Sequence, residues 1–441
     1  MGHSEKNIRY VAKAGGALKG TVRVASDKSI SHRSIMFGSL AEGVTEVYDF
    51  LEGEDALATL KAFRDMGVSI EGPKNGRVTI RGVGMHGLKP PKNALDLGNS
   101  GTSMRLLSGL LAGQSFDCTL IGDKSLSGRP MRRVTDPLSK MGAKIDSTEK
   151  GTAPLRIHGG SKLKGIRYDM PMASAQVKSC LLLAGLYAEG ETSVTEPGVT
   201  RDHTERMLQG YGYDVKVEGS RVTLQGGGKL VSPGKLQVPA DISSSAFFLV
   251  GASIAPGSNL LLTDVGINPT RTGVIDILKL MGADLTLENQ RMAGGEPIAD
   301  IRVRSAKLKG INIPEELVPL AIDEFPALFV AAACAEGRTV LTGAEELRVK
   351  ESDRIQAMAD GLVALGVKAK ATPDGIIIDG GPISGGEVDS LGDHRIAMSF
   401  TMAALRASGD IIINDCANVA TSFPNFVSLS REAGLDMTVE G

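Results

Sequence analysis

Tryptophan is absent from the chain, and the aromatic residue types together make up 4% of it. Lys and Arg number 49 against 51 Asp and Glu, so the net charge is -2 and no basic or Arg-Gly-rich tail stands out. Proteins that bind single-stranded nucleic acid combine a basic groove with aromatic side chains on which bases stack. Nucleic acid is therefore not an expected partner, and any affinity for an anion must come from local clusters of Lys and Arg.

Metal-ligating and membrane-spanning patterns are also missing. The four Cys lie far apart, at 118, 180, 334 and 416, without a C-x-x-C pair, which argues against a zinc site or a redox pair. The six His are scattered, and none pairs with another at metal-ligand spacing. The longest apolar runs are too short to cross a bilayer, and the first residues show no apolar signal segment. We therefore expect a cytoplasmic protein with neither a metal nor a membrane contact.

The chain has 42% hydrophobic and 23% charged residues. One pattern of residues recurs six times along it. Each copy has a helix that opens on small or acidic residues, a Gly, a short strand, a loop, a second helix and a second Gly. The openings are SISHRSIMFGSL at 29, SGTSMRLLSGLL at 100, SAQVKSCLLLAG at 174, SSSAFFLVGASI at 243, DEFPALFVAAAC at 323 and DHRIAMSFTMAA at 393. The first glycines, expected to end the first helices in the left-handed conformation, are Gly43, Gly113, Gly190, Gly257, Gly337 and Gly409. The second glycines, expected to end the second helices, are Gly67, Gly142, Gly212, Gly282, Gly366 and Gly434.

Strands alternate with helices in each copy, as in TSVTE at 192, NLLLTD at 259 and DIIIND at 410. This alternation predicts an α/β fold. Six units of roughly 70 residues are too many for one hydrophobic core, so we expect two domains of three units each. The division should fall near residue 239, before Pro239-Ala240-Asp241.

Lys and Arg recur near the helix openings, where each helix has unpaired backbone N–H groups and the positive end of its dipole. Those in or beside the openings are Lys28, Arg33, Arg105, Lys178 and Arg395. Those in the loops before the second helices are Arg129, Arg132, Arg133, Arg201, Arg271, Arg348, Lys350 and Arg354. Any single one is more often a solvated surface charge. Their recurrence at corresponding places predicts that the fold gathers them into an anion-binding site.

Two acids accompany these cations. Asp323-Glu324 opens the fifth helix, and Glu351 stands between Lys350 and Arg354. Taken by itself, Asp323 fits a helix N-cap. A carboxylate among several cations should stay ionised, however, and that suits a general base.

Nine segments give the chain a specific resemblance. They are SDKSISHR at 26–33, LGNSGTSMR at 97–105, GRPMRRV at 128–134, SAQVKS at 174–179, RDHTERM at 201–207, VPADISSSAFF at 238–248, DEFPALF at 323–329, LRVKESDRI at 347–355 and DHRIAMSF at 393–400. In this order they resemble the motifs of the 5-enolpyruvylshikimate-3-phosphate synthase family, and their residues are more similar to those of its second class. The resemblance implies an enolpyruvyl transferase fold of the inverse α/β barrel type, with two domains of three βαβαββ units. It also implies one discontinuous domain, 1–22 plus 240–441, and a second one, 23–239.

That family transfers the enolpyruvyl (1-carboxyvinyl) group of phosphoenolpyruvate to the 5-hydroxyl of shikimate 3-phosphate and releases phosphate, in the shikimate pathway of aromatic amino acid biosynthesis. The implied shikimate 3-phosphate residues are Lys28, Ser29, Arg33, Ser174, Ala175, Gln176, Arg201, Asp323 and Lys350. The implied phosphoenolpyruvate residues are Lys28, Asn99, Gly101, Arg129, Gln176, Arg354 and Arg395. The implied catalytic groups are Asp323 as base, Glu351 as the acid that protonates the methylene carbon, and Lys28. No metal or organic cofactor is implied, and a monomer is expected.

Two residues depart from the family wording. Thr421 stands where the first class has a Lys, before Ser422-Phe423-Pro424, and we assign it no substrate contact. Gly101 stands where many second-class enzymes have Ala, at the place where phosphoenolpyruvate and the inhibitor glyphosate bind in the family.

Two other functions stay open. A transferase acting on UDP-N-acetylglucosamine shares the fold, but its family carries a Cys shortly before the Arg-Pro that matches Arg129-Pro130, and residues 124–128 contain none. The second alternative is a repeat-built protein that processes or binds RNA, which the low aromatic content disfavours.

Overall fold

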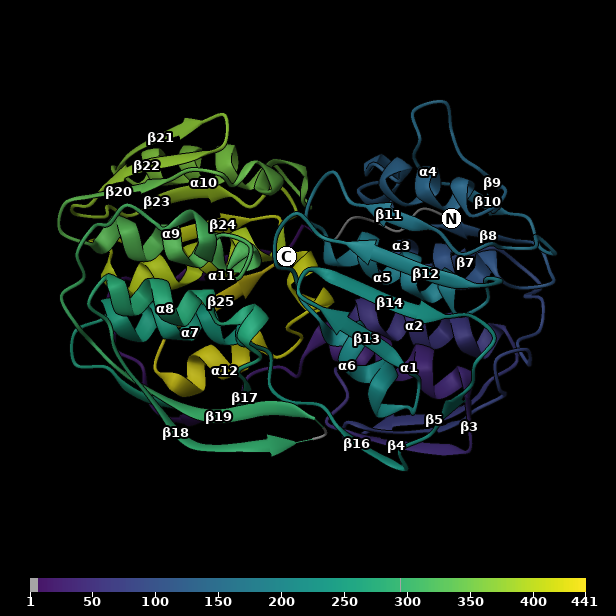
Figure 1. Cartoon of the computed structure of the whole chain (residues 1–441). Coiled ribbons are helices and arrows are strands. Elements are labelled where there is room, and N and C mark those ends of the chain that lie inside the picture. Colours follow the sequence, from purple (N-terminus) through teal and green to yellow (C-terminus); the bar gives the residue numbers. More distant parts are fainter. Residues whose placement is uncertain (1–6, 294) are drawn as a thin grey trace. The chain divides into compact units, whose positions relative to one another are not determined.

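The computed structural model describes residues 7–293 and 295–441. The chain divides into two compact units: unit 1 comprises Pro239–Gly441 with the N-terminal residues up to Ala25, and unit 2 comprises Ser26–Val238 (Figure 1). Both units are built from small mixed sheets and helices, so the α/β fold predicted from the alternation of elements is confirmed.

Unit 2, all of whose residues are described, has three four-stranded sheets of one topology. In each, a parallel pair is followed by two antiparallel neighbours. The sheets, in spatial order, are β7 (Leu95–Asp96), β8 (Cys118–Ile121), β10 (Leu155–Ile157) and β9 (Ile145–Asp146); β11 (Arg167–Asp169), β12 (Glu191–Thr195), β14 (Arg221–Gln225) and β13 (Val215–Glu218); and β16 (Lys235–Gln237), β4 (Val44–Tyr48), β6 (Arg77–Arg81) and β5 (Ser69–Lys74). A short parallel pair joins β3 (Ala41–Glu42) to β15 (Leu230–Val231).

The described part of unit 1 repeats this topology. Its sheets are β2 (Lys19–Val22), β17 (Asn259–Gly266), β19 (Glu296–Arg304) and β18 (Asp284–Ala293); β23 (Gly386–Asp389), β24 (Ile411–Asn414), β1 (Arg9–Ala12) and β25 (Met437–Glu440); and β20 (Arg338–Leu341), β22 (Gly375–Asp379) and β21 (Lys368–Thr372). A single parallel bridge from Asn312 to Val340 on β20 takes the place of the missing parallel strand in the last sheet.

Two strands pair far from their sequence neighbours. β2 comes just before the first helix of unit 2, yet it pairs in parallel with β17 of unit 1. β16 comes just before Pro239, where the chain enters unit 1 again, and it pairs with β4 of unit 2. Because β1 also lies between β24 and β25, the N-terminal residues complete two sheets of unit 1.

The first helix of each copy lies in the core of its unit. These helices are α1 (Lys28–Leu40), α3 (Gly101–Ala112), α5 (Ala175–Gly185), α7 (Ile242–Ile254), α9 (Phe325–Cys334) and α11 (His394–Ala403). Every residue of α7 and of α11 is buried, as expected for helices without a polar face. Within unit 1, α7, α9 and α11 pack against one another, and Figure 1 shows them side by side.

The second helices have an exposed face, and all but α10 are shorter than the first helix of their copy: α2 (Glu54–Asp65), α4 (Arg132–Lys140), α6 (His203–Gly210), α8 (Gly273–Leu280), α10 (Arg354–Ala364) and α12 (Phe426–Ala433). Short 3₁₀ turns connect the elements: η1 (Leu126–Gly128), η2 (Pro269–Arg271), η3 (Glu315–Leu317), η4 (Ile322–Glu324), η5 (Glu345–Val349), η6 (Ala404–Arg406) and η7 (Ala417–Thr421).

The predicted helix openings are confirmed by capping hydrogen bonds. Side-chain oxygens of the N-cap residues accept backbone N–H groups of the first turn at Asp27, Ser100, Ser174, Asp241 and Asp393. The fifth opening differs, because Asp323 lies inside η4 and α9 begins only at Phe325.

The two sets of glycines behave differently. The second set lies one or two residues beyond the last residue of the second helices, with φ of 89°, 100°, 81°, 94°, 81° and 124°, so the predicted left-handed helix ends are confirmed. For the first set the predicted position at the helix end is wrong, although Gly43, Gly190, Gly257 and Gly337 do take the left-handed conformation, with φ of 98°, 86°, 82° and 95°. Gly113 is the C-cap of α3 but has a φ of -88°, and the other five lie three or more residues beyond their helices, because extended or turn residues such as Ala41 and Ala335 intervene.

Candidate active site

The start of α1 holds two of the expected cations. The Lys28 ammonium lies 2.9 Å from Oδ2 of Asp55 in α2. Arg33 is buried, and its Nε donates to Thr204 Oγ1 at 2.8 Å while Nη2 donates to Ser179 Oγ at 3.1 Å. Nη1 of Arg33 donates to the Ser29 carbonyl at 3.0 Å, so the Arg33 side chain runs back along the first turn of α1.

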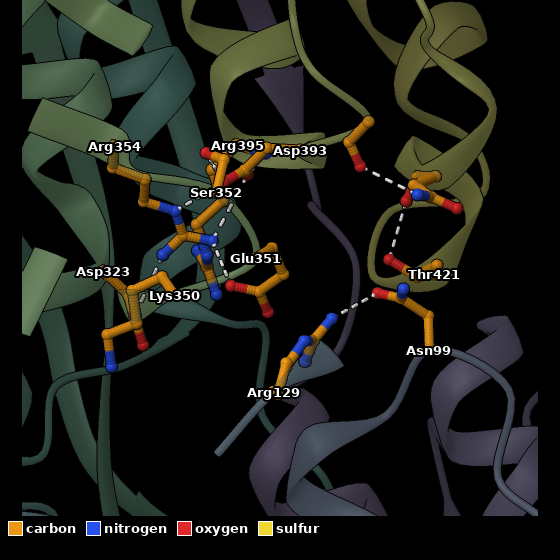
Figure 2. A network of polar contacts seen from close by, with 12 residues as sticks. Asn99, Arg129, Asp323, Lys350, Glu351, Ser352, Arg354, Asp393, Arg395 and Thr421 are labelled. Atoms are coloured by element: carbon orange, nitrogen blue, oxygen red, sulfur yellow. Dashed lines mark hydrogen bonds and ion pairs between the residues drawn. The ribbon is translucent and has the colours of Figure 1, made fainter. Parts of the chain in front are cut away.

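The start of α3 and the turn η1 are tied together through Asn99. Its Nδ2 donates to Asp123 Oδ2 at 2.9 Å. Its Oδ1 accepts from Arg129 Nη2 at 2.9 Å, as Figure 2 shows. Gly101 is the first residue of α3, and a Cβ at this position would lie 2.8 Å from Arg129 Nη1. The absence of a side chain at Gly101 therefore lets the Arg129 guanidinium lie against the helix start.

The start of α5 is joined to α3. Ser174 caps α5 by accepting the Val177 N–H, and Ala175 is the first helical residue. Gln176 accepts from Arg105 Nη1 at 2.5 Å and donates to Thr102 Oγ1 at 3.1 Å. Side-chain contacts therefore join the starts of α3 and α5, and Arg33 links α1 to α5 through Ser179.

Arg201 and Arg105 are two further cations of unit 2. Arg201 lies half-buried in the loop between β12 and α6. Arg105 was noted from the sequence only as a cation near a helix opening. Its Nη2 donates to the Pro130 carbonyl at 3.1 Å, so it joins Gln176 to the residue after Arg129. Its place inside LGNSGTSMR was a signal for this role.

The corresponding cluster of unit 1 is organised around Arg354, which is fully buried at the start of α10 (Figure 2). Its Nε and Nη2 donate to the two oxygens of Asp393 at 2.8 and 3.3 Å. Nη2 also donates to Glu351 at 2.7 Å, and Nη1 donates to Asp323 at 3.4 Å. Burial lowers the pKa of Arg354, but Asp393, Glu351 and Asp323 outweigh it and raise the pKa overall.

Asp393 is the partner that sequence reasoning missed. It is fully buried, and it also caps α11 by accepting the Arg395 N–H at 3.0 Å and accepts the Ser352 hydroxyl at 2.8 Å. Burial raises the pKa of Asp393, but the Arg354 guanidinium outweighs it and leaves the pKa lowered. The signal was present, since Asp393 opens the DHRIAMSF segment, but its partner cannot be read from the sequence.

Lys350, Glu351 and Arg395 lie around this cluster (Figure 2). The Lys350 ammonium is 4.0 Å from Glu346 Oε1. Burial lowers the pKa of Lys350, against the attraction of Asp323 and Glu346. Arg395 is buried in the first turn of α11. Thr421, to which no contact was assigned, is buried and donates its hydroxyl to the Asn418 carbonyl at 2.6 Å.

The two clusters can attract anions and move protons. Each combines guanidinium and ammonium groups with backbone N–H groups at helix starts, and unit 1 adds three carboxylates in contact with Arg354: Asp323, Glu351 and Asp393. Among the residues that the structure describes, no group of three or more His, Cys, Asp and Glu could hold a metal ion. No helix in that same part of the chain is long and apolar enough to span a membrane.

Comparison with known proteins gives a consistent result. The profile described as EPSP synthase (3-phosphoshikimate 1-carboxyvinyltransferase) matches residues 12–429. The 3-phosphoshikimate 1-carboxyvinyltransferase of Methylococcus capsulatus is 69% identical over 435 residues, which cover 99% of each chain. That of Alkalilimnicola ehrlichii is 67% identical and covers 98% of this chain and 97% of its own. The structure of EPSP synthase from Acinetobacter baumannii is 65% identical, with a TM-score of 0.88 over 99% of this chain and 100% of its own. The chain therefore belongs to the EPSP synthase (3-phosphoshikimate 1-carboxyvinyltransferase) family.

Proposed function

We propose that this transferase moves the enolpyruvyl group of phosphoenolpyruvate onto the 5-hydroxyl of shikimate 3-phosphate and releases phosphate. The substrates together bring two phosphates and two carboxylates. The observation that carries the proposal is a matching set of cations at helix starts, with Asp323 and Glu351 among the three carboxylates that contact the buried Arg354. Such preorganised charges stabilise anionic substrates and transition states without reorganisation.

We assign shikimate 3-phosphate to one group of side chains of unit 2. The residues at the starts of α1 and α5 and in the loop before α6 would bind its phosphate and ring hydroxyls; they are Lys28, Ser29, Arg33, Ser174, Ala175, Gln176 and Arg201. The Arg33 guanidinium, held by Thr204 and Ser179, is fixed in direction before a ligand arrives. In unit 1, Lys350 is assigned to the same substrate.

Phosphoenolpyruvate is assigned to Asn99, Gly101 and Arg129, together with Lys28 and Gln176, and in unit 1 to Arg354 and Arg395. The close approach of Arg129 to Gly101 supports a compact anion site at the start of α3. The Lys28 ammonium would neutralise charge on the departing phosphate, which is its catalytic role.

Asp323 is proposed as the base and Glu351 as the acid. In the addition step, the 5-hydroxyl oxygen bonds to the enol carbon, Asp323 takes the hydroxyl proton, and Glu351 gives a proton to the methylene carbon. In the elimination step, Glu351 takes a proton back from the new methyl group while the bond to phosphate breaks. The proton on Asp323 leaves with phosphate, so the protons balance.

The contacts of Glu351 suggest how it becomes an acid. Its carboxylate is held by Arg354 Nη2 at 2.7 Å. A substrate carboxylate that binds Arg354 would compete with Glu351 for this guanidinium and release Glu351 to act on the methylene carbon. The chemistry calls for no metal or organic cofactor.

The remaining assignments are also proposals. We take 1–22 plus 240–441 and 23–239 as the two domains, and we expect a cytoplasmic monomer whose partners are these small-molecule substrates. The activity itself is tested by mass analysis of the organic product from both substrates. Formation of shikimate 3-phosphate carrying one added carboxyvinyl group supports the proposal, and recovery of unchanged shikimate 3-phosphate from folded protein contradicts it.

A further inference from the structure

Lys178 is a buried ammonium of unit 2, held between the buried carboxylate of Glu205 and the largely buried carboxylate of Glu196. Its side chain is 1% exposed, and Nζ lies 3.0 Å from Glu196 Oε1 and 3.0 Å from Glu205 Oε2. Lys178 belongs to the first turns of α5, Glu196 directly follows β12, and Glu205 belongs to α6. One charge therefore joins three segments of the chain.

These contacts hold both ends of the loop that carries Arg201. The loop, residues 196–202, starts at Glu196, which also accepts the hydroxyl of Thr200. Thr200 is buried and directly precedes Arg201. A continuous path of contacts thus leads from Lys178 through Glu196 and Thr200 to the residue beside Arg201.

A second path leads to Arg33. Ser179 and Thr204, the sequence neighbours of Lys178 and Glu205, are joined by a hydrogen bond of 2.7 Å between their hydroxyls. Arg33 donates to both hydroxyls. Lys178 fixes the distance between α5 and α6 through its contact with Glu205. The contacts of Arg33 with Ser179 on α5 and Thr204 on α6 depend on that same distance.

The charges make this arrangement costly unless Lys178 is present. Two carboxylates face one ammonium in a site with little solvent, and burial raises the pKa of Glu205 in spite of its contact with Lys178. A buried ion pair often does not increase the stability of the folded protein, because apolar side chains of similar volume at the same positions give equal or higher stability. What the charges supply here is a defined geometry for the loop and for α6.

We propose that Lys178 is a positioning residue for binding of the substrate phosphate, acting on Arg201 through Glu196 and Thr200 and on Arg33 through Glu205 and Thr204. This inference rests on the proposed function, in which Arg201 and Arg33 bind the phosphate of shikimate 3-phosphate.

The test is Lys178→Met, which keeps the length of the side chain and removes the charge. The dissociation constant and Michaelis constant for shikimate 3-phosphate should rise roughly 10-fold or more, because a partner of a buried charge cluster is lost. The Michaelis constant for phosphoenolpyruvate at saturating shikimate 3-phosphate should change less than about threefold. Lys61→Met is the matched control, because Lys61 pairs with Asp65 at 2.9 Å on the exposed face of α2 in the same unit. Equal rises in both Michaelis constants, or no rise, would overturn the proposal.

Thr200→Val provides a second measurement that does not depend on the folding of Lys178→Met. It removes the hydroxyl that contacts Glu196 and keeps the size and the charges, so the protein should fold and bind shikimate 3-phosphate more weakly, with phosphoenolpyruvate unaffected. Unchanged binding of shikimate 3-phosphate by folded Thr200→Val would refute the path to Arg201.

A double-mutant cycle separates this inference from the proposed function. If Lys178 acts through Arg201, the losses of affinity in Lys178→Met and Arg201→Met should combine to less than their product; a full product would overturn the inference. Unchanged affinity in Arg201→Met alone would contradict the assignment of Arg201 in the proposed function, and the inference would fall with it. A loss in Arg201→Met without one in Lys178→Met would leave the proposed function standing and overturn the inference only.

Discussion

Adding one methyl group at Gly101 should disturb the Arg129 guanidinium. A Cβ would lie 2.8 Å from Arg129 Nη1, whereas ordinary contacts begin near 3.4 Å, so the guanidinium must recede by about 0.6 Å. That movement strains the 2.9 Å hydrogen bond from Arg129 to Asn99. Overpacking of this kind costs roughly 1–3 kcal/mol, which corresponds to about 5- to 150-fold in affinity.

The Gly101→Ala enzyme should therefore have a raised Michaelis constant for phosphoenolpyruvate, near the lower end of this range, because a flexible arginine can partly give way. Glyphosate is the longer molecule, so its inhibition constant should rise by a clearly larger factor. Steady-state phosphate release, with and without glyphosate, measures both constants.

Gly128→Ala is the matched control. Gly128 precedes Arg129, and a Cβ there would meet nothing within 4 Å, so both constants should stay close to those of the parent. If Gly101→Ala raises the two constants by the same factor, the methyl group does not discriminate by ligand length. If neither constant changes, Arg129 does not carry the contact, and the reasoning fails at its first step.

Three further predictions concern other parts of the molecule. Asp323→Asn should lower turnover on the order of 100-fold or more with small changes in both Michaelis constants, measured by initial rates; unchanged turnover would remove Asp323 as the base. Burial lowers the pKa of Lys350, so Lys350 loses its charge at a lower pH than an exposed lysine does. Binding of shikimate 3-phosphate, measured as a function of pH, should weaken as the pH rises through that lowered pKa. In Lys350→Arg, which keeps its charge, the loss of binding should move to higher pH. Gly212 has a φ of 81° and open space around it, so Gly212→Ala should lower the free energy of unfolding by about 1 kcal/mol through backbone strain alone, and an unchanged urea midpoint would show that the turn relaxes.

Local signals predicted much of the fold. Ser100, Ser174 and Asp393 cap helices where their segments were expected to open, because a capping side chain acts on the backbone of its own first turn. The second glycines were also predictable, because the left-handed conformation that ends a helix is a local requirement of the backbone. The first glycines misled, because a turn glycine needs the left-handed conformation whether or not a helix ends directly before it.

Long-range pairing could not be predicted from single segments. Nothing in Lys19–Val22 indicates that this strand pairs with β17 rather than with a strand of unit 2, since both alternatives satisfy the same backbone hydrogen bonds. The attachment of the N-terminal strands to unit 1 was available only from the family resemblance.

The cations of the candidate site were predictable, but their partners were not. Arg354 stood out because it follows Lys350 and Glu351 within a few residues. It donates two hydrogen bonds to Asp393, which lies 39 residues away and meets it only through the packing of α10 and α11. Lys178 shows the same limit, because its two carboxylates come from other elements of the fold. Sequence patterns indicate which charges are present, and tertiary structure decides which of them are paired.

The most direct test of the central claim is the acceptor dependence of phosphate release from phosphoenolpyruvate. Purified protein is given phosphoenolpyruvate alone, with shikimate 3-phosphate, or with UDP-N-acetylglucosamine, and free phosphate is followed over time. The account predicts sustained release with shikimate 3-phosphate and none above background in the other two reactions. Release that depends on UDP-N-acetylglucosamine, or that proceeds without any acceptor, would contradict it.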